Sequence, residues 1–316
     1  MPPVEPTLAA LSNPLLRYFM ATRPVFLSVS LIAALIGIGT AYHSGTPLAV
    51  WPAIITVAFA LVAHAGVNVL NDYYDDLNGT DRFNTERVFP FTGGSRFIQN
   101  GVLTLRETAM FGALLMLIVI FGGLWLTRIS GLGMLLIGAL GMFIGWAYSA
   151  PPLKLNSRGV GEVCVWGGFA LIVIGADYVQ RRGFSMQPVI ASACYALLVT
   201  NILYINQFPD RRADEMAGKH HWVVRLGATR ARWGYFVIAI TGYVWLIGAA
   251  VAGHLPLLAL IALPPAALSA KAGCVLLQFA DRPPLLEPAL KMTAAAACAH
   301  GLLLALALIA ASGSGA

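Results

Sequence analysis

The sequence contains few charged residues for its length. Only 11% of its 316 residues are Asp, Glu, Lys or Arg, whereas soluble domains carry about 25%. Hydrophobic residues make up 58% of the chain. This composition excludes a disordered chain and argues against an ordinary soluble globule. It also excludes a nucleic-acid-binding protein, despite a net charge of +6, because the basic residues are scattered between apolar runs.

Cysteine is also scarce. Cys164, Cys194, Cys274 and Cys298 stand far apart inside apolar runs, and no two of them form a CxxC pair. Neither a disulfide framework nor a zinc site is therefore indicated. We interpret all four side chains as small, buried hydrophobic groups.

Long apolar runs take up most of the chain. A helix that spans a bilayer needs about 20 mostly apolar residues. Nine segments approach this length: about 24–42, 48–72, 107–127, 130–149, 161–180, 187–208, 231–252, 255–277 and 287–311. Lipid-exposed backbone must satisfy its own hydrogen bonds, so these segments should be helices. We expect an all-α polytopic membrane protein, a nine-helix bundle forming a single domain over residues 1–316 with its core at about 20–311.

The basic residues predict how the bundle is oriented. If the nine helices alternate in direction, every lysine and arginine except Arg128, Arg181 and Arg182 falls on the side of the N-terminus. Positive charge marks the cytoplasmic side of a membrane. We therefore expect a cytoplasmic N-terminus in a bacterial-type inner membrane. The long polar connections at about 73–106 and 209–230 lie on that side too, so we expect the active site there.

Acidic residues are few but clustered. Of the 14 in the chain, more than half fall in two short segments. The pattern Asn-x3-Asp-x3-Asp occurs twice, as Asn68, Asp72 and Asp76 and again as Asn206, Asp210 and Asp214. A step of four residues advances only about 40° around a helix, so each set forms one stripe. Asp75 extends the first stripe, and Pro209 predicts a kink or restart in the second helix.

Two stripes of carboxylates predict metal binding. Like charges four residues apart repel each other unless a partner neutralises them. Oxygen-only ligands suit Mg²⁺, which binds through one or two carboxylates together with substrate phosphates. A single Asp would more simply cap a helix or lie solvated in a loop, but the doubled pattern favours two Mg²⁺ ions around a diphosphate. The predicted metal ligands are Asn68, Asp72, Asp75, Asp76, Asp210 and Asp214.

Basic side chains near the stripes are candidate diphosphate ligands, because a diphosphate requires fixed cations and backbone N–H groups. They are Arg96, which ends the segment Gly93-Gly94-Ser95-Arg96, and Lys154, Lys219 and Arg225. The alternative is that these residues are ordinary cytoplasmic charges, which the orientation alone explains.

At these residues the chain resembles the UbiA superfamily of intramembrane prenyltransferases. The resemblance covers about residues 20–310 and rests on segments 71–76, 93–96, 148–155 and 210–219. The runs at 92–104 and 224–227 are most similar to the branch that prenylates 1,4-dihydroxy-2-naphthoate for menaquinone. The stretch Asn206-Gln207-Phe208-Pro209-Asp210 and the pair His220-His221 depart from the simplest form of the second motif, which leaves the choice of acceptor open.

The resemblance implies a nine-helix bundle with a cavity that faces the cytoplasm. A polyprenyl diphosphate would bind there through two Mg²⁺ ions bridged by both acidic motifs, with its tail leaving into the bilayer, and an aromatic acceptor would receive the prenyl group. The expected catalytic residues are Asp72, Asp76, Asp210, Asp214 and Tyr148. Tyr148 would stabilise an allylic cation with its ring face, although an interfacial anchor is an equal interpretation of this residue.

Two alternatives remain open at this point. One is a transporter whose Asp and Asn side chains line an ion path, although such carboxylates usually lie near the membrane midplane. The other is the same prenyl transfer to a different aromatic ring, such as 4-hydroxybenzoate or homogentisate.

Overall fold

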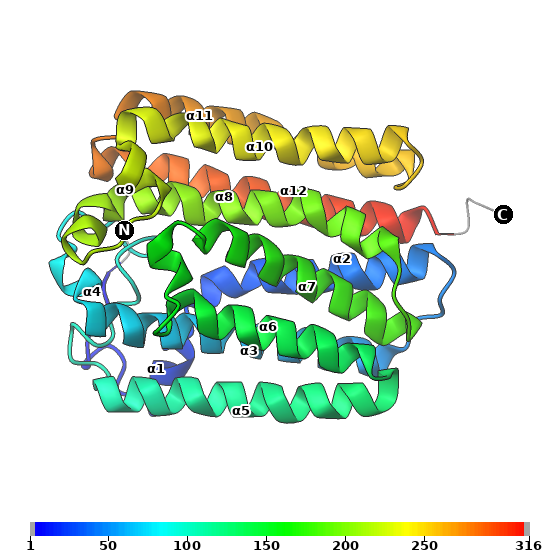
Figure 1. Ribbon diagram of the computed structural model, residues 1–316, viewed down its shortest axis with the longest axis horizontal. Helices are drawn as coiled ribbons and strands as arrows, with labels where there is room; N and C mark the ends of the chain where they lie inside the picture. The colour runs from blue at the N-terminus through cyan, green and yellow to red at the C-terminus, as the bar shows by residue number, and fades with distance from the viewer. Residues whose placement is uncertain (1–3, 313–316) are drawn as a thin grey trace.

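The computed structural model describes residues 4–312, which form α-helices and short 3₁₀ helices without a strand (Figure 1). The elements, in chain order, are α1 (Pro14–Ala21), α2 (Pro24–His43), α3 (Val50–Asn78), α4 (Thr80–Phe83), α5 (Leu105–Ser130), α6 (Gly133–Ser149), η1 (Leu155–Arg158), α7 (Gly161–Arg181), α8 (Met186–Met216), α9 (Trp222–Leu226), α10 (Ala228–Val251), η2 (Leu257–Ala262), α11 (Ala266–Phe279), η3 (Pro283–Leu286) and α12 (Glu287–Ala310).

Within the described residues, eight helical segments are long and apolar enough to cross a membrane. They comprise α2, α3, α5, α7, α8, α10, η2 with α11, and η3 with α12. The expected segment 130–149 is the shorter apolar helix α6, whose 17 residues measure about 25 Å. The structure confirms the predicted all-α membrane fold, with eight full-length spans and this one shorter helix.

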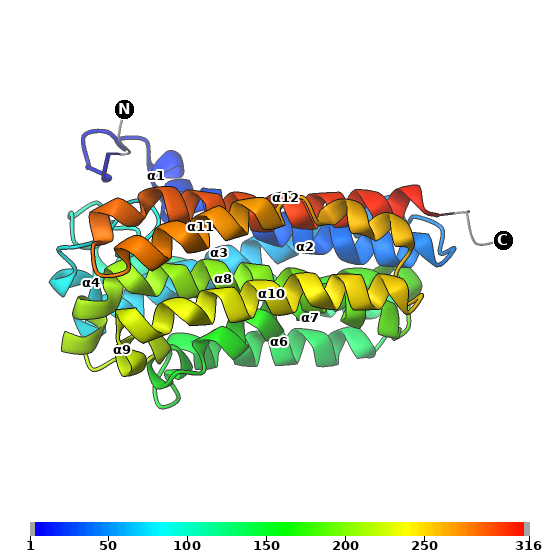
Figure 2. The same cartoon turned by 90° about the horizontal axis from the view of Figure 1, so that it is seen from above.

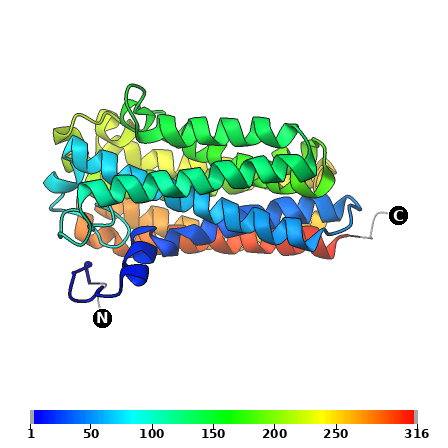
Figure 3. The ribbon, with the colours of Figure 1, turned by 90° about the horizontal axis from the view of Figure 1, so that it is seen from below.

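The long helices run side by side along one axis, as the views in Figures 1 and 2 agree. The connections at one end of the bundle are long: 79–104, 150–160 and 217–227. The connections at the other end are short, such as 44–49 and 182–185. The N-terminal segment and α1 lie at the end with the long connections (Figure 3). We call these the long-loop end and the short-loop end.

The core lies where α2, α7, α8 and α12 meet. Ile36, Val173, Tyr195 and Leu304, one from each helix, are fully buried there. Lipid tails are as apolar as the helices themselves, so tight packing rather than water exclusion holds such helices together. Gly37 illustrates this packing, because a Cβ atom at this position would overlap the carbonyl oxygen of Val173.

Two helices extend further than the sequence predicts. α3 ends at Asn78 and α8 at Met216, whereas the apolar runs end near 72 and 208. Both acidic stripes therefore lie on helical turns at the long-loop end. The predicted restart at Pro209 is wrong, because α8 continues through this residue. Neighbouring helices can accommodate a proline inside a membrane helix, so the missing backbone N–H does not end it.

Two predictions about burial are wrong. Cys164 and Cys194 are buried as expected, but Cys298 is half-buried and Cys274 is exposed. Apolar residues cover the outer surface of a membrane bundle too, so hydrophobicity alone does not predict burial there.

The sequence also favours an exposed ion pair of Asp177 with Arg181, yet the Asp177 side chain is only 1% exposed and accepts from Arg181 at 2.9 Å and from Thr40 at 2.9 Å.

The close contact at Gly37 leads to a stability prediction. Gly37→Ala should destabilise the protein by about 2 kcal/mol, because the added methyl group forces α2 away from α7. Gly248→Ala in α10 is the matched control, since within residues 4–312 a Cβ built there meets no other helix or non-neighbouring side chain within 4 Å. Thermal unfolding in detergent should show a lower midpoint for the first variant only, and equal midpoints would contradict this account of the packing.

Candidate active site

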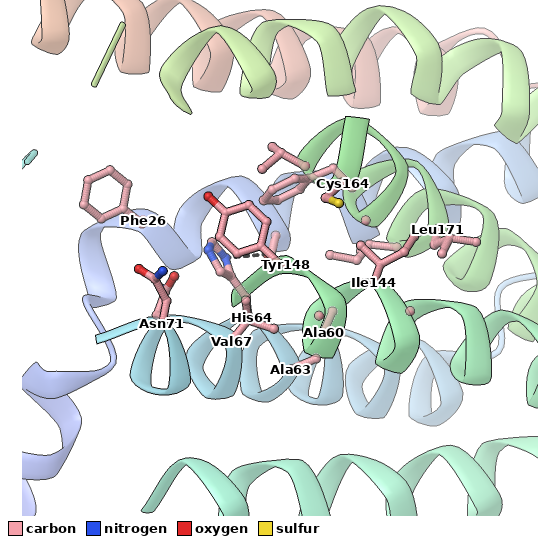
Figure 4. Close-up of a pocket in the computed structure, with 18 of the residues that line it drawn as sticks. Phe26, Ala60, Ala63, His64, Val67, Asn71, Ile144, Tyr148, Cys164 and Leu171 are labelled. Atoms are coloured by element: carbon pink, nitrogen blue, oxygen red, sulfur yellow. Dashed lines mark hydrogen bonds between the residues drawn. The ribbon is translucent and has the colours of Figure 1, made fainter. Parts of the chain in front are cut away.

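A cavity of about 560 Å³ lies between α2, α3, α5, α6, α7 and α8. Its long-loop end is polar, and its lining there includes Asp75, Asp81, Asp210, Asp214 and Lys219. The rest is mostly apolar and follows α6 from Tyr148 back to Met134. In the view of Figure 4, Asn71, His64 and Tyr148 lie toward one end of the cavity, and Ala60, Ile144 and Leu171 lie further along it. One cavity therefore joins a charged compartment to a long apolar channel.

The first acidic stripe divides between the cavity and the loops. Asp75 lines the cavity and accepts a hydrogen bond from Asn71 at 3.1 Å. Asp72 does not line it and pairs instead with Arg23. Asp76 also lies outside the lining and accepts two hydrogen bonds from Arg82, at 3.0 and 2.8 Å. The three buried carboxylates at the end of α3 thus have different partners.

The second stripe lies in the cavity wall. Asp210 accepts from the Nδ2 group of Asn84 at 2.5 Å and from the backbone N–H of Gly93 at 3.3 Å. Asp214 lies 3.0 Å from Nε2 of His221. Both carboxylates line the cavity together with Asp75, so the two acidic motifs face the same space.

Lys219 joins the two motifs directly. Its Nζ lies 2.8 Å from Asp75 on α3 and 3.3 Å from Asp214 on α8. Burial by itself would lower the pKa of Lys219, but the negative charges of Asp75 and Asp214 outweigh burial and raise its pKa. The amine therefore remains protonated and neutralises part of the repulsion between the two carboxylates.

Asp81 on α4 is a further carboxylate of the cavity, although the sequence does not single it out as a ligand. Burial, and then the nearby charge of Asp75, raises the pKa of Asp81 to about 7. Its Oδ2 atom is buried without a hydrogen-bond partner among the described residues. A Cβ atom at Gly94 would overlap this carboxylate, which explains why the loop needs glycine at this position. The glycine pair and the neighbouring acidic cluster are the sequence signals for this contact.

The other predicted residues lie in two places. Asn68 and Tyr148 line the cavity, and Asn68 donates to the carbonyl of Thr22 at 3.1 Å. Arg96, Lys154 and Arg225 do not line it in this structure. Arg96 donates to the backbone carbonyl of Asp81 and lies 3.9 Å from Glu5. Lys154 donates to the side chain of Asn78 at 2.8 Å. Arg225 donates to the carbonyls of His220 and Arg158, at 2.5 and 2.8 Å.

Arg23 is a site residue that sequence reasoning missed. It directly precedes α2 in a left-handed conformation with φ of 58°, lines the cavity and pairs with Asp72. In the sequence it resembles any basic residue before a membrane helix, and no motif marks it. Only the approach of α2 to α3 at the long-loop end brings it to the acidic motif.

The carboxylates fit a hard cation such as Mg²⁺. All the acidic ligands offer oxygen atoms, and the Oδ2 atom of Asp81 has no other partner. In the part of the chain that the structure describes, no three His, Cys, Asp or Glu side chains converge closely enough to hold a metal by themselves. This arrangement suits Mg²⁺, which usually takes only one or two carboxylates and completes its shell with waters and substrate phosphates.

The pair of Arg23 with Asp72 leads to a second prediction. Arg23→Met should destabilise the protein by about 3 kcal/mol, because it leaves the buried Asp72 carboxylate without its cation. Adding Asp72→Asn should recover much of this loss by removing the unpaired charge. Unfolding midpoints in detergent test both steps; a double variant no more stable than the single one would argue against a paired charge.

Comparison with known proteins agrees with this geometry. The model of the UbiA prenyltransferase family matches residues 30–284. The 1,4-dihydroxy-2-naphthoate octaprenyltransferase of Escherichia coli (strain K12) is 28% identical over 219 residues, which cover 66% of this chain and 68% of that protein. The 2-carboxy-1,4-naphthoquinone phytyltransferase of Synechocystis sp. is 26% identical over 229 residues, covering 71% and 70% of the two chains.

A solved structure shares the fold. It is a UbiA homolog from Archaeoglobus fulgidus bound to DMAPP and Mg²⁺, with a TM-score of 0.62 and 17% sequence identity. The alignment covers 93% of this chain and 99% of that one. The family match at 30–284 includes both acidic motifs, the glycine-rich loop and Lys219. On this evidence, the chain belongs to the UbiA prenyltransferase family.

Proposed function

We propose that the protein transfers a prenyl group from a prenyl diphosphate to an aromatic acceptor in an Mg²⁺-dependent reaction. The observation that carries the proposal is the single cavity, which joins the carboxylates of both motifs and Lys219 to an apolar channel. A diphosphate suits the charged compartment and an isoprenoid tail suits the channel. The long-loop end, which carries most of the basic residues, would face the cytoplasm.

The channel suits a long hydrocarbon chain. The part of α6 from Met134 to Tyr148 lines it over about 21 Å. Gly123, Gly138 and Gly168 also line it, and in the described part of the chain a Cβ built on any of them meets no other helix or non-neighbouring side chain within 4 Å. These glycines keep the walls of the channel apart. Relative to water, each buried CH₂ of the tail would contribute about 0.8 kcal/mol, whether it lies in the channel or in the bilayer.

The charged compartment supplies what the leaving diphosphate requires. Asp75, Asp81, Asp210 and Asp214 would hold Mg²⁺ together with the substrate phosphates. When bound, Mg²⁺ neutralises the diphosphate and stabilises the negative charge that develops as it leaves. Lys219 would donate N–H groups to the same oxygens, at a position that burial keeps protected from bulk water.

The side chains beyond the carboxylates would protect and direct the reacting carbon. As the bond from C1 to oxygen breaks, C1 becomes an allylic cation, and the electron-rich ring of the acceptor attacks it. A proton, or carbon dioxide from a carboxylated ring carbon, then leaves the ring. The ring of Tyr148 lines the cavity between the two compartments, where its face can stabilise the cation. The apolar channel keeps out water, which would otherwise trap the cation.

The acceptor that we propose is 1,4-dihydroxy-2-naphthoate, the substrate named for the Escherichia coli relative. A relative from Mycobacterium tuberculosis carries the same name at 29% identity over 197 residues. Membranes containing the protein should be incubated with farnesyl, geranylgeranyl and longer diphosphates and with dihydroxynaphthoate, 4-hydroxybenzoate or homogentisate. Mass spectrometry should detect prenylated naphthoate products, and products from only one of the other rings would overturn the choice of acceptor.

The metal proposal predicts the effect of removing one carboxylate. Asp214→Asn should lower prenyl transfer by about 100-fold, because the leaving diphosphate loses electrostatic stabilisation. EDTA should abolish transfer by the wild type, and added Mg²⁺ should restore it. Asp281→Asn is the matched control, since that side chain is 56% exposed and lies in an ion pair with Arg211, away from the cavity. Near wild-type turnover of Asp214→Asn at saturating Mg²⁺ would refute the assignment.

Removing Lys219 should make folding depend on the metal. In Lys219→Met, Asp75 and Asp214 lose the cation between them, so their repulsion should lower the unfolding midpoint in EDTA. Mg²⁺ should replace the lost positive charge and restore the midpoint. The difference between the unfolding midpoints measured with and without Mg²⁺ should therefore be larger in Lys219→Met than in the wild type. Lys291→Met, at an exposed pair with Glu287, should retain the wild-type difference. If both variants show that difference unchanged, Mg²⁺ does not replace Lys219 between the carboxylates.

A further inference from the structure

The side-chain amide of Gln207 makes a hydrogen bond through its nitrogen, but its oxygen has no hydrogen-bond partner among the described residues. It lies on α8, lines the cavity and is 7% exposed. Its Nε2 donates to Oε1 of Glu162, in the first turn of α7, at 2.8 Å. An amide nitrogen donates hydrogen bonds and a carboxyl oxygen accepts them, so the nitrogen is the end of the Gln207 amide that faces Oε1 of Glu162. The Oε1 atom of Gln207 is buried without a hydrogen-bond partner among the described residues.

An unpartnered oxygen alone does not identify a site. Asn201, also on α8, donates to the carbonyl of Tyr235 at 3.1 Å and likewise has an unpartnered Oδ1. Asn201 does not line the cavity, whereas Gln207 does. A ligand in the cavity is therefore the available source of a donor for Gln207. The contact with Glu162 keeps the amide from turning its nitrogen toward that ligand.

We propose that Gln207 binds a hydroxyl group of the aromatic acceptor and that Glu162 acts as its positioning residue. This inference rests on the proposed function. Of the two substrates, only the acceptor carries an O–H donor, because the prenyl tail is a hydrocarbon and the ionised diphosphate accepts hydrogen bonds. Between the two substrates, the unpartnered oxygen therefore fits a hydroxyl group of the acceptor.

The position of Gln207 agrees with that assignment. Gln207, Asp210 and Asp214 are three and then four residues apart, so they share one face of α8, and all three line the cavity. Gln207 is about 4.5 Å along the helix from Asp210, on the side away from the loops. An acceptor bound to Gln207 would thus lie directly beside the diphosphate, where C1 is released.

The same hydrogen bond would strengthen during the reaction. When the ring carbon bonds to C1, the ring becomes positively charged and its hydroxyl becomes a stronger donor. The amide oxygen of Gln207 would therefore bind the transition state more tightly than the ground state. The ring then loses its proton or carbon dioxide, and the electron pair of that bond restores aromaticity.

The experiment compares each hydroxyl of the acceptor with its methyl ether, which leaves the ring electron-rich but removes the donor. Wild-type protein in membranes is given 1,4-dihydroxy-2-naphthoate, 1-hydroxy-4-methoxy-2-naphthoate or 4-hydroxy-1-methoxy-2-naphthoate with one prenyl diphosphate. We expect kcat/KM to fall by about tenfold or more for one of the two ethers. In Gln207→Met this preference should fall to near one, with the KM for the prenyl diphosphate unchanged.

Two further variants separate binding from folding. Asn201→Leu removes an amide of the same helix that lies outside the cavity and whose oxygen likewise has no partner among the described residues, so this variant should retain the wild-type preference. In Glu162→Gln, the new amide can either accept from or donate to the Gln207 amide, so it no longer fixes which way Gln207 is turned. This variant should raise the KM for the dihydroxy acceptor more than it lowers kcat. If Gln207→Met does not turn over, the rise in unfolding midpoint on adding the dihydroxy acceptor or its ether measures the same preference without catalysis.

The outcomes distinguish the two proposals. A wild type that prenylates the dihydroxy acceptor and both ethers equally well, or a Gln207→Met variant that keeps the preference, overturns the role of Gln207 and leaves the proposed function intact. If Gln207→Met does not fold, Glu162→Gln becomes the deciding variant. An unchanged KM for the acceptor in that variant overturns the inference. A wild type that prenylates no aromatic acceptor overturns both proposals.

Discussion

The buried ammonium of Lys219 is the interaction on which the rest of the site depends. The chain places Asp75 at the end of one long helix and Asp214 at the end of another, and both carboxylates are largely shielded from water. Two such charges facing one space would drive α3 and α8 apart. A lysine between them makes the arrangement stable without a metal and holds the two motifs against the same cavity.

The acidic residues divide into two groups with different physical roles. Asp75, Asp210 and Asp214 face the cavity, where a ligand can reach them. Asp72 and Asp76 face the loops and are held by arginines, which fixes the connections to the end of α3. The repeated motif therefore does more than place carboxylates in the cavity. Part of it anchors the loops that close the charged compartment.

The fold was largely predictable from the sequence, because lipid imposes a helix on every long apolar segment. The acidic motifs were also predictable, because carboxylates are rare in an apolar chain and two regularly spaced groups of them stand out. The contacts of Arg23 and the position of Asp81 could not be predicted, because they depend on how α2 and α4 approach α3. Periodicity shows which residues share a helix face, but not which neighbour that face meets. A proline by itself predicts either a kink or a restart, and the helices packed around α8 allow it to continue through Pro209.

The short length of α6 affects the surrounding bilayer. At about 25 Å, it falls short of a hydrocarbon core of about 30 Å. Lipids next to it must therefore shorten or tilt their chains, at a cost of a fraction of a kcal/mol per ångström of mismatch. The apolar channel runs along this same helix. Any thinning of the bilayer at α6 therefore occurs beside the channel that this helix lines.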